Sequence, residues 1–461
     1  MTAQAIEQQD AARSKPLYAA IWRWHFYAGI VFAPFLILLA VTGGIYLFKP
    51  QFESWMYKDY YYVQETDPSK LSPSAQIEVV KKAYPDAVVT KYKPPIEADR
   101  SAEVGVIHNK QPATVYVNPY NGKILGEIRD DDRIMGQIRK LHGKLMIGTI
   151  GDRLIELAAC WGMILLITGI YLWWPRGRKS LLGTLVPRLN KGKRIFWRDL
   201  HAVPAFWLSL FVAFLILTGL PWSGLWGEMI KSVATATHTG YPAHLFPWDP
   251  KPESTIPTKE VGNVPWAAEN LPVPSSAEKA SGVTPVQPIS VEKVMEIAAA
   301  RQVHPGYDIS FPKGPKGVYT VFVSTGRPQD QATLHIDQYS GNVLADLRFK
   351  DYGILAKLIS IGVALHQGQY FGLVNQIACL LVCIGLILIS VSGIVLWWKR
   401  KPTGQLGSPP LPSNFKLLKG VAVIVVVLGL VFPLVGVSLL LVLLLDRLVI
   451  HRIPAIRQWM A

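Results

Sequence analysis

The sequence predicts an α-helical integral membrane protein with about five transmembrane helices, arranged as a duplicated two-plus-two bundle plus one C-terminal helix, with two small α+β domains outside the membrane. Three observations predict this class. Half of the 461 residues are hydrophobic and only 17% are charged, unlike an average soluble enzyme. Apolar runs long enough to cross about 30 Å of hydrocarbon recur along the chain. The spacing of several residues in the first half returns in the second.

Charge and hydropathy together predict the topology. Residues 175–200 carry eight basic side chains against one acidic, and residues 399–419 carry five against none, so these two loops hold most of the net charge of +15. Because Lys and Arg gather in cytoplasmic loops, we expect a cytoplasmic N-terminus and two long polar stretches outside. The positive charge is then a membrane signal, and we expect no nucleic-acid partner. Apolar runs of transmembrane length lie at about 25–48, 153–174, 203–222, 375–398 and 420–446.

These signals divide the chain into segments. Each external domain begins with a helical pattern, continues with β-rich runs and ends in a hairpin-like turn. Pro433 lies near the middle of the last apolar run, where we expect one span and keep a kinked hairpin as the alternative. The predicted order is the N-terminus and first span (1–48), external domain 1 (49–141), an interfacial segment and second span (142–174), a basic loop (175–200), the third span (201–222), a Pro/Trp-rich insertion (223–288), external domain 2 (289–365), an interfacial segment and fourth span (366–398), a basic loop (399–419), and the fifth span with a tail (420–461).

Histidines and glycines recur at equal spacing in the two halves. His25 and His201 each open a span 17 residues before a Thr-Gly pair, Thr42-Gly43 and Thr218-Gly219. His142 and His366 each follow a leucine and stand 6 and 27 residues before two glycines, which are Gly148 and Gly169 in the first half and Gly372 and Gly393 in the second. We expect glycines to break each of these stretches into a short interfacial helix and a span, because a continuous helix would be longer than the bilayer requires.

The repeated histidines predict haem. Equivalent residues of parallel repeats share a depth, so His25 and His201 form a cytoplasmic pair and His142 and His366 an external pair. One such histidine alone is more often an interfacial side chain bound to a carbonyl or a headgroup, but two facing imidazoles suit the two axial positions of a b-type haem. No Cys-x-x-Cys-His attachment motif is present. We therefore expect two b-type haems whose iron is ligated by His25 and His201 and by His142 and His366.

Several questions stay open at this level. No nucleotide-binding or dinucleotide-binding motif is present, so a separate donor has to deliver electrons. The insertion 223–288, with Trp222 just before it, is either an irregular linker on the membrane surface or a wall of a ligand pocket. Trp222, Trp226 and Trp248 are the candidate substrate contacts there.

The residues that carry these patterns resemble a known family. The span-opening His25 and His201, the Leu-His pairs at His142 and His366, and the Thr-Gly-Ile-Tyr-Leu-Trp-Trp-Pro-Arg run from Thr168 to Arg176 are similar to those of bacterial PepSY-associated transmembrane proteins. These iron-regulated inner-membrane proteins include ferric-siderophore reductases. The resemblance implies two b haems, two periplasmic PepSY-like domains and periplasmic reduction of siderophore-held iron, without naming the siderophore.

The residues and the resemblance together predict a function. We expect an inner-membrane di-haem b oxidoreductase, embedded in membrane lipid, that takes electrons from a cytosolic or quinol donor. It would pass them to ferric-siderophore iron in the periplasm and release Fe(II). Two alternatives remain: a siderophore or metal permease without haem, and a membrane-anchored PepSY sensor or assembly factor.

Overall fold

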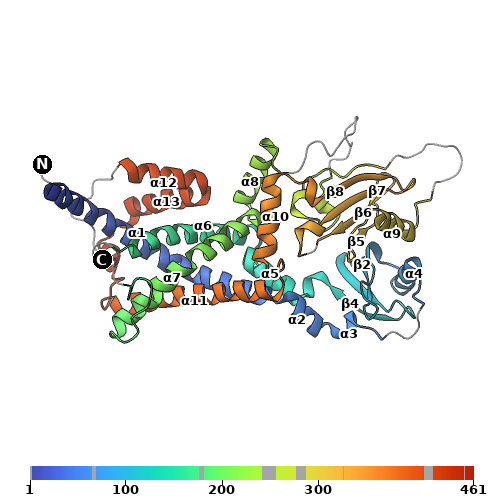
Figure 1. The fold of residues 1–461 in the computed structure, drawn as a ribbon, viewed down its shortest axis with the longest axis horizontal. Coiled ribbons are helices and arrows are strands. Elements are labelled where there is room, and N and C mark those ends of the chain that lie inside the picture. Colours follow the sequence, from blue (N-terminus) through green and yellow to red (C-terminus); the bar gives the residue numbers. More distant parts are fainter. Residues whose placement is uncertain are drawn as a thin grey trace. The chain divides into compact units, whose positions relative to one another are not determined.

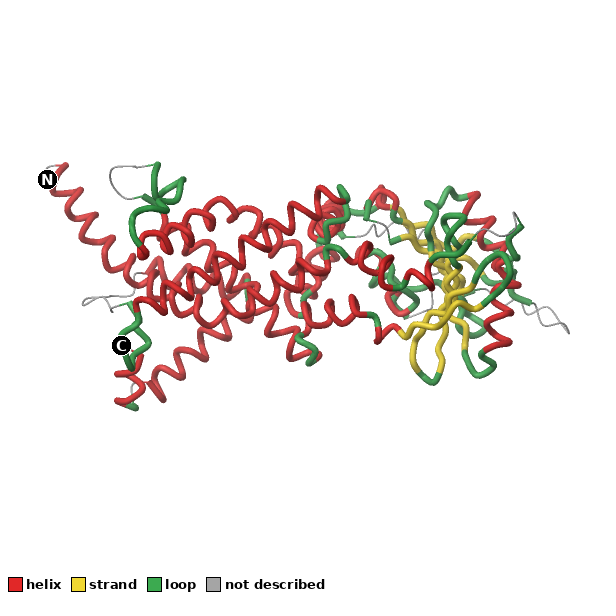
Figure 2. The backbone as a smooth tube through the Cα atoms, turned by 90° about the horizontal axis from the view of Figure 1, so that it is seen from below, coloured by secondary structure: helices red, strands yellow, loops and turns green. Residues whose placement is uncertain are grey.

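The chain forms two compact units. The computed structural model describes residues 3–64, 69–175, 181–240, 256–276, 287–324, 326–409, 419–450 and 452–460. The first unit, here the helical unit, consists of Met1–Leu47, Ile138–Ile230 and Gln376–Ala461. The second, the sheet unit, consists of Phe48–Gln137 and Lys231–Asn375 and contains the strands seen in Figure 2.

The number of membrane-length helices in the described residues agrees with the five predicted spans. The candidate spans are Leu17–Tyr46, Gly148–Trp173, Lys193–Trp222, Leu373–Arg400 and Pro433–Ile450. Each is at least 18 residues long with a mean hydropathy of 1.9 or more, which suits a helix surrounded by lipid. The helices that wholly or largely belong to this unit are α1 (Ala3–Tyr46), α5 (Ile134–Lys144), α6 (Gly148–Trp173), α7 (Lys193–Gly219), α11 (Leu373–Arg400), α12 (Lys419–Val431), α13 (Pro433–Leu445) and α14 (Pro454–Met460).

The prediction of one uninterrupted span over 420–446 is wrong. The helix stops at Val431 and starts again at Pro433, and α12 and α13 lie side by side as a hairpin (Figure 1). Proline has no N–H to donate, and its ring clashes with the preceding turn of a continuous helix. The two helices meet closely: a Cβ on Gly429 would stand 3.3 Å from the Cα of Gly436. The kinked alternative is therefore the one that the fold adopts.

The predicted helix breaks before the second and fourth spans are confirmed. Helix α5 carries His142 and ends at Lys144, and α6 begins only at Gly148. In the second half, α10 (Ile354–His366) is separated from α11 by Gly368 and Gly372, which have φ of +70° and +59°. Glycine adopts this left-handed conformation without a Cβ clash, so the chain can turn there between two helices.

The strands of the two predicted external domains join into one antiparallel sheet. Its order is β4-β3-β2-β1-β5-β6-β7-β8, so each half of the chain contributes four neighbouring strands. Lys91 of β1 pairs with Ser310 of β5 at the joint, and Tyr92 pairs with Ile309. The two domains therefore share a continuous backbone ladder. The strands are β1 (Val88–Lys93), β2 (Ala102–His108), β3 (Gln111–Val117), β4 (Ile124–Arg129), β5 (Asp308–Ser310), β6 (Val318–Val323), β7 (Ala332–Asp337) and β8 (Val343–Arg348).

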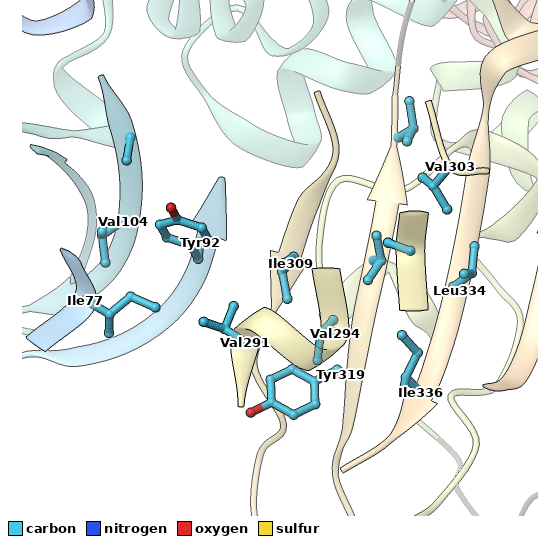
Figure 3. Packing of buried hydrophobic residues seen from close by; sticks show 14 of the residues in the cluster. Ile77, Tyr92, Val104, Val291, Val294, Val303, Ile309, Tyr319, Leu334 and Ile336 are labelled. Atoms are coloured by element: carbon cyan, nitrogen blue, oxygen red, sulfur yellow. The ribbon is translucent and has the colours of Figure 1, made fainter. Parts of the chain in front are cut away.

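One face of this sheet is covered by two equivalent helices, α4 (Pro73–Ala83) and α9 (Val291–Ala300). Figure 3 shows Ile77 of α4 beside the strand residues Val104 and Tyr92, and Val294 of α9 beside Tyr319 of β6. A serine caps each helix: the Ser72 hydroxyl accepts from the N–H of Ala75, and Ser290 does the same for Lys293. Each fully buried aliphatic side chain contributes roughly 1.5–3 kcal/mol, so this core holds the two halves together. The remaining helices are α2 (Lys49–Met56), α3 (Lys58–Tyr61) and α8 (Leu225–Ala236).

The opposite face of the sheet is covered differently in its two halves. In the first half, Arg133 donates to the hydroxyl oxygens of Tyr116 at 2.7 Å and Tyr61 at 3.2 Å. Burial raises the pKa of the Tyr116 phenol. In the second half, the position equivalent to Tyr116 holds His335, whose Nδ1 lies 3.0 Å from the hydroxyl of Thr320. Burial lowers the pKa of His335 to about 4.

Part of the Pro/Trp-rich insertion forms the cover of this second half. Residues 256–276 lie across the sheet, and Val264, Ala268 and Leu271 pack with Phe322 and Leu347 of the strands. The segment is further tied down where the Ser310 hydroxyl donates to the carbonyl of Val261 at 2.9 Å. This stretch therefore belongs to the core of the sheet unit, and the prediction of an irregular surface linker does not hold for it.

Candidate functional site

His25, the first of the four predicted ligands, lies on α1 and reaches α6. Its Nδ1 is 2.8 Å from the hydroxyl oxygen of Thr168. A Cβ on Gly169 would stand 3.3 Å from the Cε1 of the imidazole, closer than most real contacts. The Thr-Gly pair therefore forms a recess for the ring, in which the hydroxyl holds one edge and the missing side chain leaves the space.

His201 lies on α7 and meets an equivalent recess in α11. Its Nδ1 is 2.8 Å from the carbonyl oxygen of Ile389 and 3.5 Å from the hydroxyl of Ser392. A Cβ on Gly393 would stand 3.1 Å from its Cε1. The second half thus repeats the first, with a backbone carbonyl as the main partner of the ring.

His142 occupies a third recess of the same kind, formed by α1. Its Nδ1 is 2.8 Å from the hydroxyl oxygen of Thr42, and a Cβ on Gly43 would stand 3.3 Å from its Cε1. In the structure, the ring beside Gly43, Gly169 and Gly393 is the imidazole of a predicted ligand.

The hydrogen bonds of Thr168 assign the tautomer of His25. The Thr168 hydroxyl donates to the carbonyl of Ile164 at 2.7 Å, so its oxygen is left to accept, and Nδ1 of His25 carries the proton. The lone pair of the ring is then on Nε2. A histidine held by a hydrogen bond at one nitrogen, with the lone pair on the other, is arranged as metal-binding histidines are.

The same assignment holds at the other two recesses. Thr42 donates to the carbonyl of Leu38 at 2.7 Å and accepts from His142, and the Ile389 carbonyl can only accept from His201. Nδ1 is therefore the donor in all three rings. With this common tautomer, the nitrogen that carries the lone pair is Nε2 in all three rings.

The structure brings the two predicted cytoplasmic-side histidines together. The ring centroids of His25 and His201 are 6.4 Å apart, and the ring planes cross at 78°. Within the described part of the chain, no hydrogen bond to Nε2 of either ring is found. Two imidazoles with these nitrogens available can serve as opposite ligands of one metal ion.

The second predicted pair falls in different compact units. His142 belongs to the helical unit, whereas His366 ends α10 in the sheet unit. Both side chains are partly exposed. A shared site of His142 and His366 therefore stays a prediction.

The three tryptophans predicted as substrate contacts are not gathered into one site. The side chain of Trp222 is 50% exposed. Trp226 packs against the cluster of α6 and α13 that contains Cys160 and Phe432. Trp248 lies outside the described residues, so the structure does not test its role.

Two buried carboxylates, which the sequence analysis did not single out, fix segments next to the histidine recesses. Fully buried Asp199, two residues before His201, accepts from the backbone and guanidinium of Arg188 and so anchors the basic loop. Glu156 in α6 accepts from the N–H groups of Leu225 and Trp226, both at 2.8 Å, and so caps α8. The sequence did offer a signal for each: Asp199 is the one acidic residue of the basic loop 175–200, and Glu156 is the one acidic residue of the predicted span 153–174. A buried carboxylate needs a hydrogen-bond or charged partner, so either position could have been predicted to have one.

Fold and site together define a class of protein: a multi-pass helical membrane protein with a duplicated set of histidine recesses and an extramembrane sheet. The sequence pattern of the family described as the PepSY-associated TM region matches residues 22–400. The chain belongs to this family, as its motifs indicated. None of the curated proteins matches the chain.

Proposed function

We propose that the protein is a di-haem b oxidoreductase that carries electrons across the membrane. The observation that carries this proposal is the close pair of His25 and His201, with ring centroids 6.4 Å apart, Nδ1 of each ring hydrogen-bonded and Nε2 bearing the lone pair. A hydrogen bond at Nδ1 orients a ligating ring and raises its basicity. A pathway for a metal ion in transit would not need two rings held in this way.

The dimensions of the pair fit a bis-imidazole iron. A metal–imidazole bond is about 2 Å long and the ring centre lies about 1 Å further, so two ligands on opposite sides of one ion have centroids about 6 Å apart. The observed separation is 6.4 Å. The three cysteines are free thiols buried in the helical unit, and none belongs to a covalent haem motif, which suits a b-type haem.

The residues of this chain have distinct tasks in the proposed mechanism. A bound haem supplies a one-electron Fe(III)/Fe(II) couple. His25 and His201 would hold the inner haem, while Thr168 and the Ile389 carbonyl orient their rings. The apolar helices around the pair would exclude water from the group, and this burial, together with the two imidazoles, would set its potential. His142 and His366 would hold the outer haem.

The direction of transfer and the acceptor extend the proposal beyond the pair. We place the protein in the bacterial inner membrane with its N-terminus in the cytoplasm, because the basic loops 175–200 and 399–419 mark that side. The sheet unit is then periplasmic and PepSY-like. Electrons pass from a cytosolic or quinol donor to siderophore-bound Fe(III), which is released as Fe(II). The family membership and the resemblance support a ferric siderophore as the acceptor.

Purified protein tests this function directly. We expect a Soret band and an α band that sharpen on reduction, and oxidation of the reduced haem when a ferric siderophore is added. Formation of Fe(II) is followed with a ferrous chelator. A colourless preparation that still binds iron chelates would contradict the proposal and support the permease. Full biological function without His25 and His201 would support the sensor or assembly factor.

A further inference from the structure

Helices α12 and α13 form a hairpin that lies beyond the part of the chain matched by the family pattern, which ends at residue 400. The proposed function gives this hairpin no role. Its two helices lie side by side, and α13 packs against α6 of the bundle (Figure 1). What the hairpin contacts in the membrane depends on how deeply it enters and on which side it ends.

Neither arm of the hairpin is long enough to cross the bilayer. Helices α12 and α13 have 13 residues each, which is about 20 Å at the α-helical rise, against about 30 Å of hydrocarbon. Lys419 is the first residue of α12, and Asp446 and Arg447 follow α13 directly. Charged side chains are costly in hydrocarbon, so they mark where each apolar arm ends. The stretch Pro433–Ile450 reaches the length of a span only when the charged turn Asp446–Ile450 is counted with it.

The turn of the hairpin lies at the depth of the middle of α6. Phe432 and Val435 are 6% and 0% exposed, and they belong to one packed cluster with Cys160 and Ile164 of α6. Cys160 stands at the middle of the 26-residue α6. Because α6 is itself a membrane-length helix, its middle lies near the centre of the bilayer, and the turn of the hairpin lies there with it.

The backbone at the turn is protected in the way that the interior of a membrane requires. The N–H of Phe432 donates to the carbonyl of Leu428 at 2.8 Å, and the N–H of Gly436 donates to the carbonyl of Phe432 at 3.2 Å. The indole N–H of Trp161 on α6 donates to the hydroxyl of Ser438 at 3.1 Å and so fastens α13 to the bundle. A helix break is tolerated inside hydrocarbon only where protein buries it. The burial of Phe432 therefore allows the turn to stay in the membrane.

The two ends of the hairpin meet the same end of the helical unit. After the hairpin, the carbonyl of Trp459 in α14 accepts from the N–H of Leu406 at 2.7 Å. Leu406 belongs to the basic loop 399–419 that leads to α12, and its own carbonyl accepts from the indole N–H of Trp397 in the last turn of α11 at 2.8 Å. The chain therefore leaves one end of the bundle, turns at half depth and comes back to the end from which it left.

The outward surface of both arms is apolar. Val426 and Leu430 of α12 and Leu440 of α13 are 60%, 71% and 68% exposed. An apolar helix surface that continues from the membrane spans suits the acyl chains of lipid. Since the turn stops near the centre of the bilayer, this surface reaches the chains of one leaflet.

We propose that the hairpin is re-entrant: it enters the membrane from the side of the basic loop 399–419, returns to that side, and packs its outward surface against the acyl chains of that leaflet alone. The described chain then crosses the bilayer four times, through α1, α6, α7 and α11. The proposed function makes this side cytoplasmic, and only the name of the side rests on it. The return of the hairpin follows from its own geometry.

The side on which the hairpin ends is tested in sealed membrane vesicles of both orientations with a membrane-impermeant maleimide. The full-length protein carries one added cysteine, and the protein without it gives the background, since its three own cysteines are buried. We expect Gln458→Cys on exposed α14 to react in the same vesicles as Lys191→Cys of the other basic loop. Lys82→Cys of the sheet unit should react only in the opposite ones. Reaction of Gln458→Cys together with Lys82→Cys would overturn the proposal, because the hairpin would then be a kinked single span.

The depth of the turn is tested with a nitroxide attached to Leu430→Cys, near the turn, or to Leu445→Cys, at the far end of α13. Both side chains are exposed, at 71% and 54%, so a label at either site faces lipid. Collisions with oxygen report the hydrocarbon, and collisions with a water-soluble nickel complex report the surface. We expect the label at Leu430 to meet oxygen more often and nickel less often than the label at Leu445. Equal access of the nickel complex to both labels would overturn the proposal, because the arms would then be two full spans.

These readouts are independent of haem and so separate the proposal from the proposed function. Protein that contains both haems but has Gln458 on the side of Lys82 contradicts only the re-entrant hairpin. Protein without haem in which Gln458 lies with Lys191 and Leu430 lies deep supports the hairpin and contradicts only the proposed function.

Discussion

At the histidine recesses, both halves of the chain place an imidazole against a glycine and bind its Nδ1 to an oxygen atom, whereas equivalent positions in the sheet hold different residue types. The oxygen that meets His25 is the Thr168 hydroxyl and the one that meets His201 is the Ile389 carbonyl, while Gly169 and Gly393 leave the space for the two rings. In the sheet, by contrast, Tyr116 of the first half stands where the second half has His335.

The difference follows from what each position has to contact. Under the proposed function, two histidines that share one iron would both have to offer Nε2 to it, so the two recesses would be constrained together. Tyr116 and His335 lie under different covers, Arg133 in the first half and the segment 256–276 in the second. Each of these two sheet positions packs only against its own cover, so Tyr116 and His335 can differ without affecting one another.

The largest expected effect is on haem content. Under the proposed function, His25→Ala and His201→Ala should each remove the same one of the two proposed haems, because either variant would leave its iron with only one histidine ligand. Haem content per chain, measured as the pyridine complex, should fall by about half. His304→Ala, an exposed histidine of the sheet unit, should leave it unchanged. If the two recess variants differed in which haem they lost, the pairing would be wrong.

Filling a recess should have nearly the same effect while keeping both ligands. In Gly169→Leu and Gly393→Leu, the new side chain occupies the space of an imidazole edge, now 3.3 Å and 3.1 Å from the position of the first added carbon. We expect the inner-haem spectrum to be lost or to show one altered ligand. Gly29→Leu on α1, where an added Cβ meets nothing within 4 Å, is the control. A normal spectrum in both recess variants would show that the glycines serve only helix packing.

The sheet should lose stability in acid on account of His335. Its pKa is about 4 in the folded protein against 6.5 when unfolded, so between these values the unfolded chain binds a proton that the folded chain does not. The free energy of unfolding therefore falls by roughly 3 kcal/mol as the pH drops from 6.5 to 4. Above pH 6.5, His335 contributes no pH dependence to the free energy of unfolding. Hydrogen exchange of β6 and β7 amides would measure it. His335→Leu should abolish this slope; an unchanged slope would assign it to other groups.

The smallest expected effect is at the equivalent position of the first half. Arg133→Met removes the donors to Tyr116 and Tyr61 and should lower the free energy of unfolding by about 1–3 kcal/mol, because the buried Tyr116 and the partly buried Tyr61 lose a charged hydrogen-bond partner. Arg129→Met, whose partner Asp132 is as exposed as the arginine itself, should change the free energy of unfolding by less than about 1 kcal/mol. Chemical denaturation of both variants tests the contrast. Equal losses of unfolding free energy would show that the hydrogen bonds from Arg133 to Tyr116 and Tyr61 contribute no more than an exposed ion pair.

Much of the architecture was predictable from local patterns. The first four spans, the breaks around Gly148 and Gly372, and the turns at Asn121-Gly122 and Ser340-Gly341 follow from hydrophobic run length and from residues with special backbone preferences. The equal spacing of His25 and His201 before their Thr-Gly pairs indicated which histidines would be equivalent. It could not indicate that each ring would lie in the recess of another span.

The joint between β1 and β5, the hairpin at Pro433 and the path of residues 256–276 were not predictable in the same way. Each of these features depends on which distant segments pack or pair with one another when the chain folds. The β1 and β5 residues that pair are more than 200 positions apart, and strand runs with open edges can pair in several orders. A single proline was compatible with a kinked span or a hairpin until the packing of Gly429 on Gly436 decided it.

The sequence by itself determined the membrane class, the family and the duplicated set of histidines, because composition, run length and spacing are properties of the linear chain. Only the tertiary structure decided that the rings of His25 and His201 lie 6.4 Å apart, centroid to centroid, and that their Nε2 atoms carry the lone pairs. The physical reason is distance along the chain. The partners that settle the tautomers lie 143 and 188 residues away, on helices that meet only when the bundle packs.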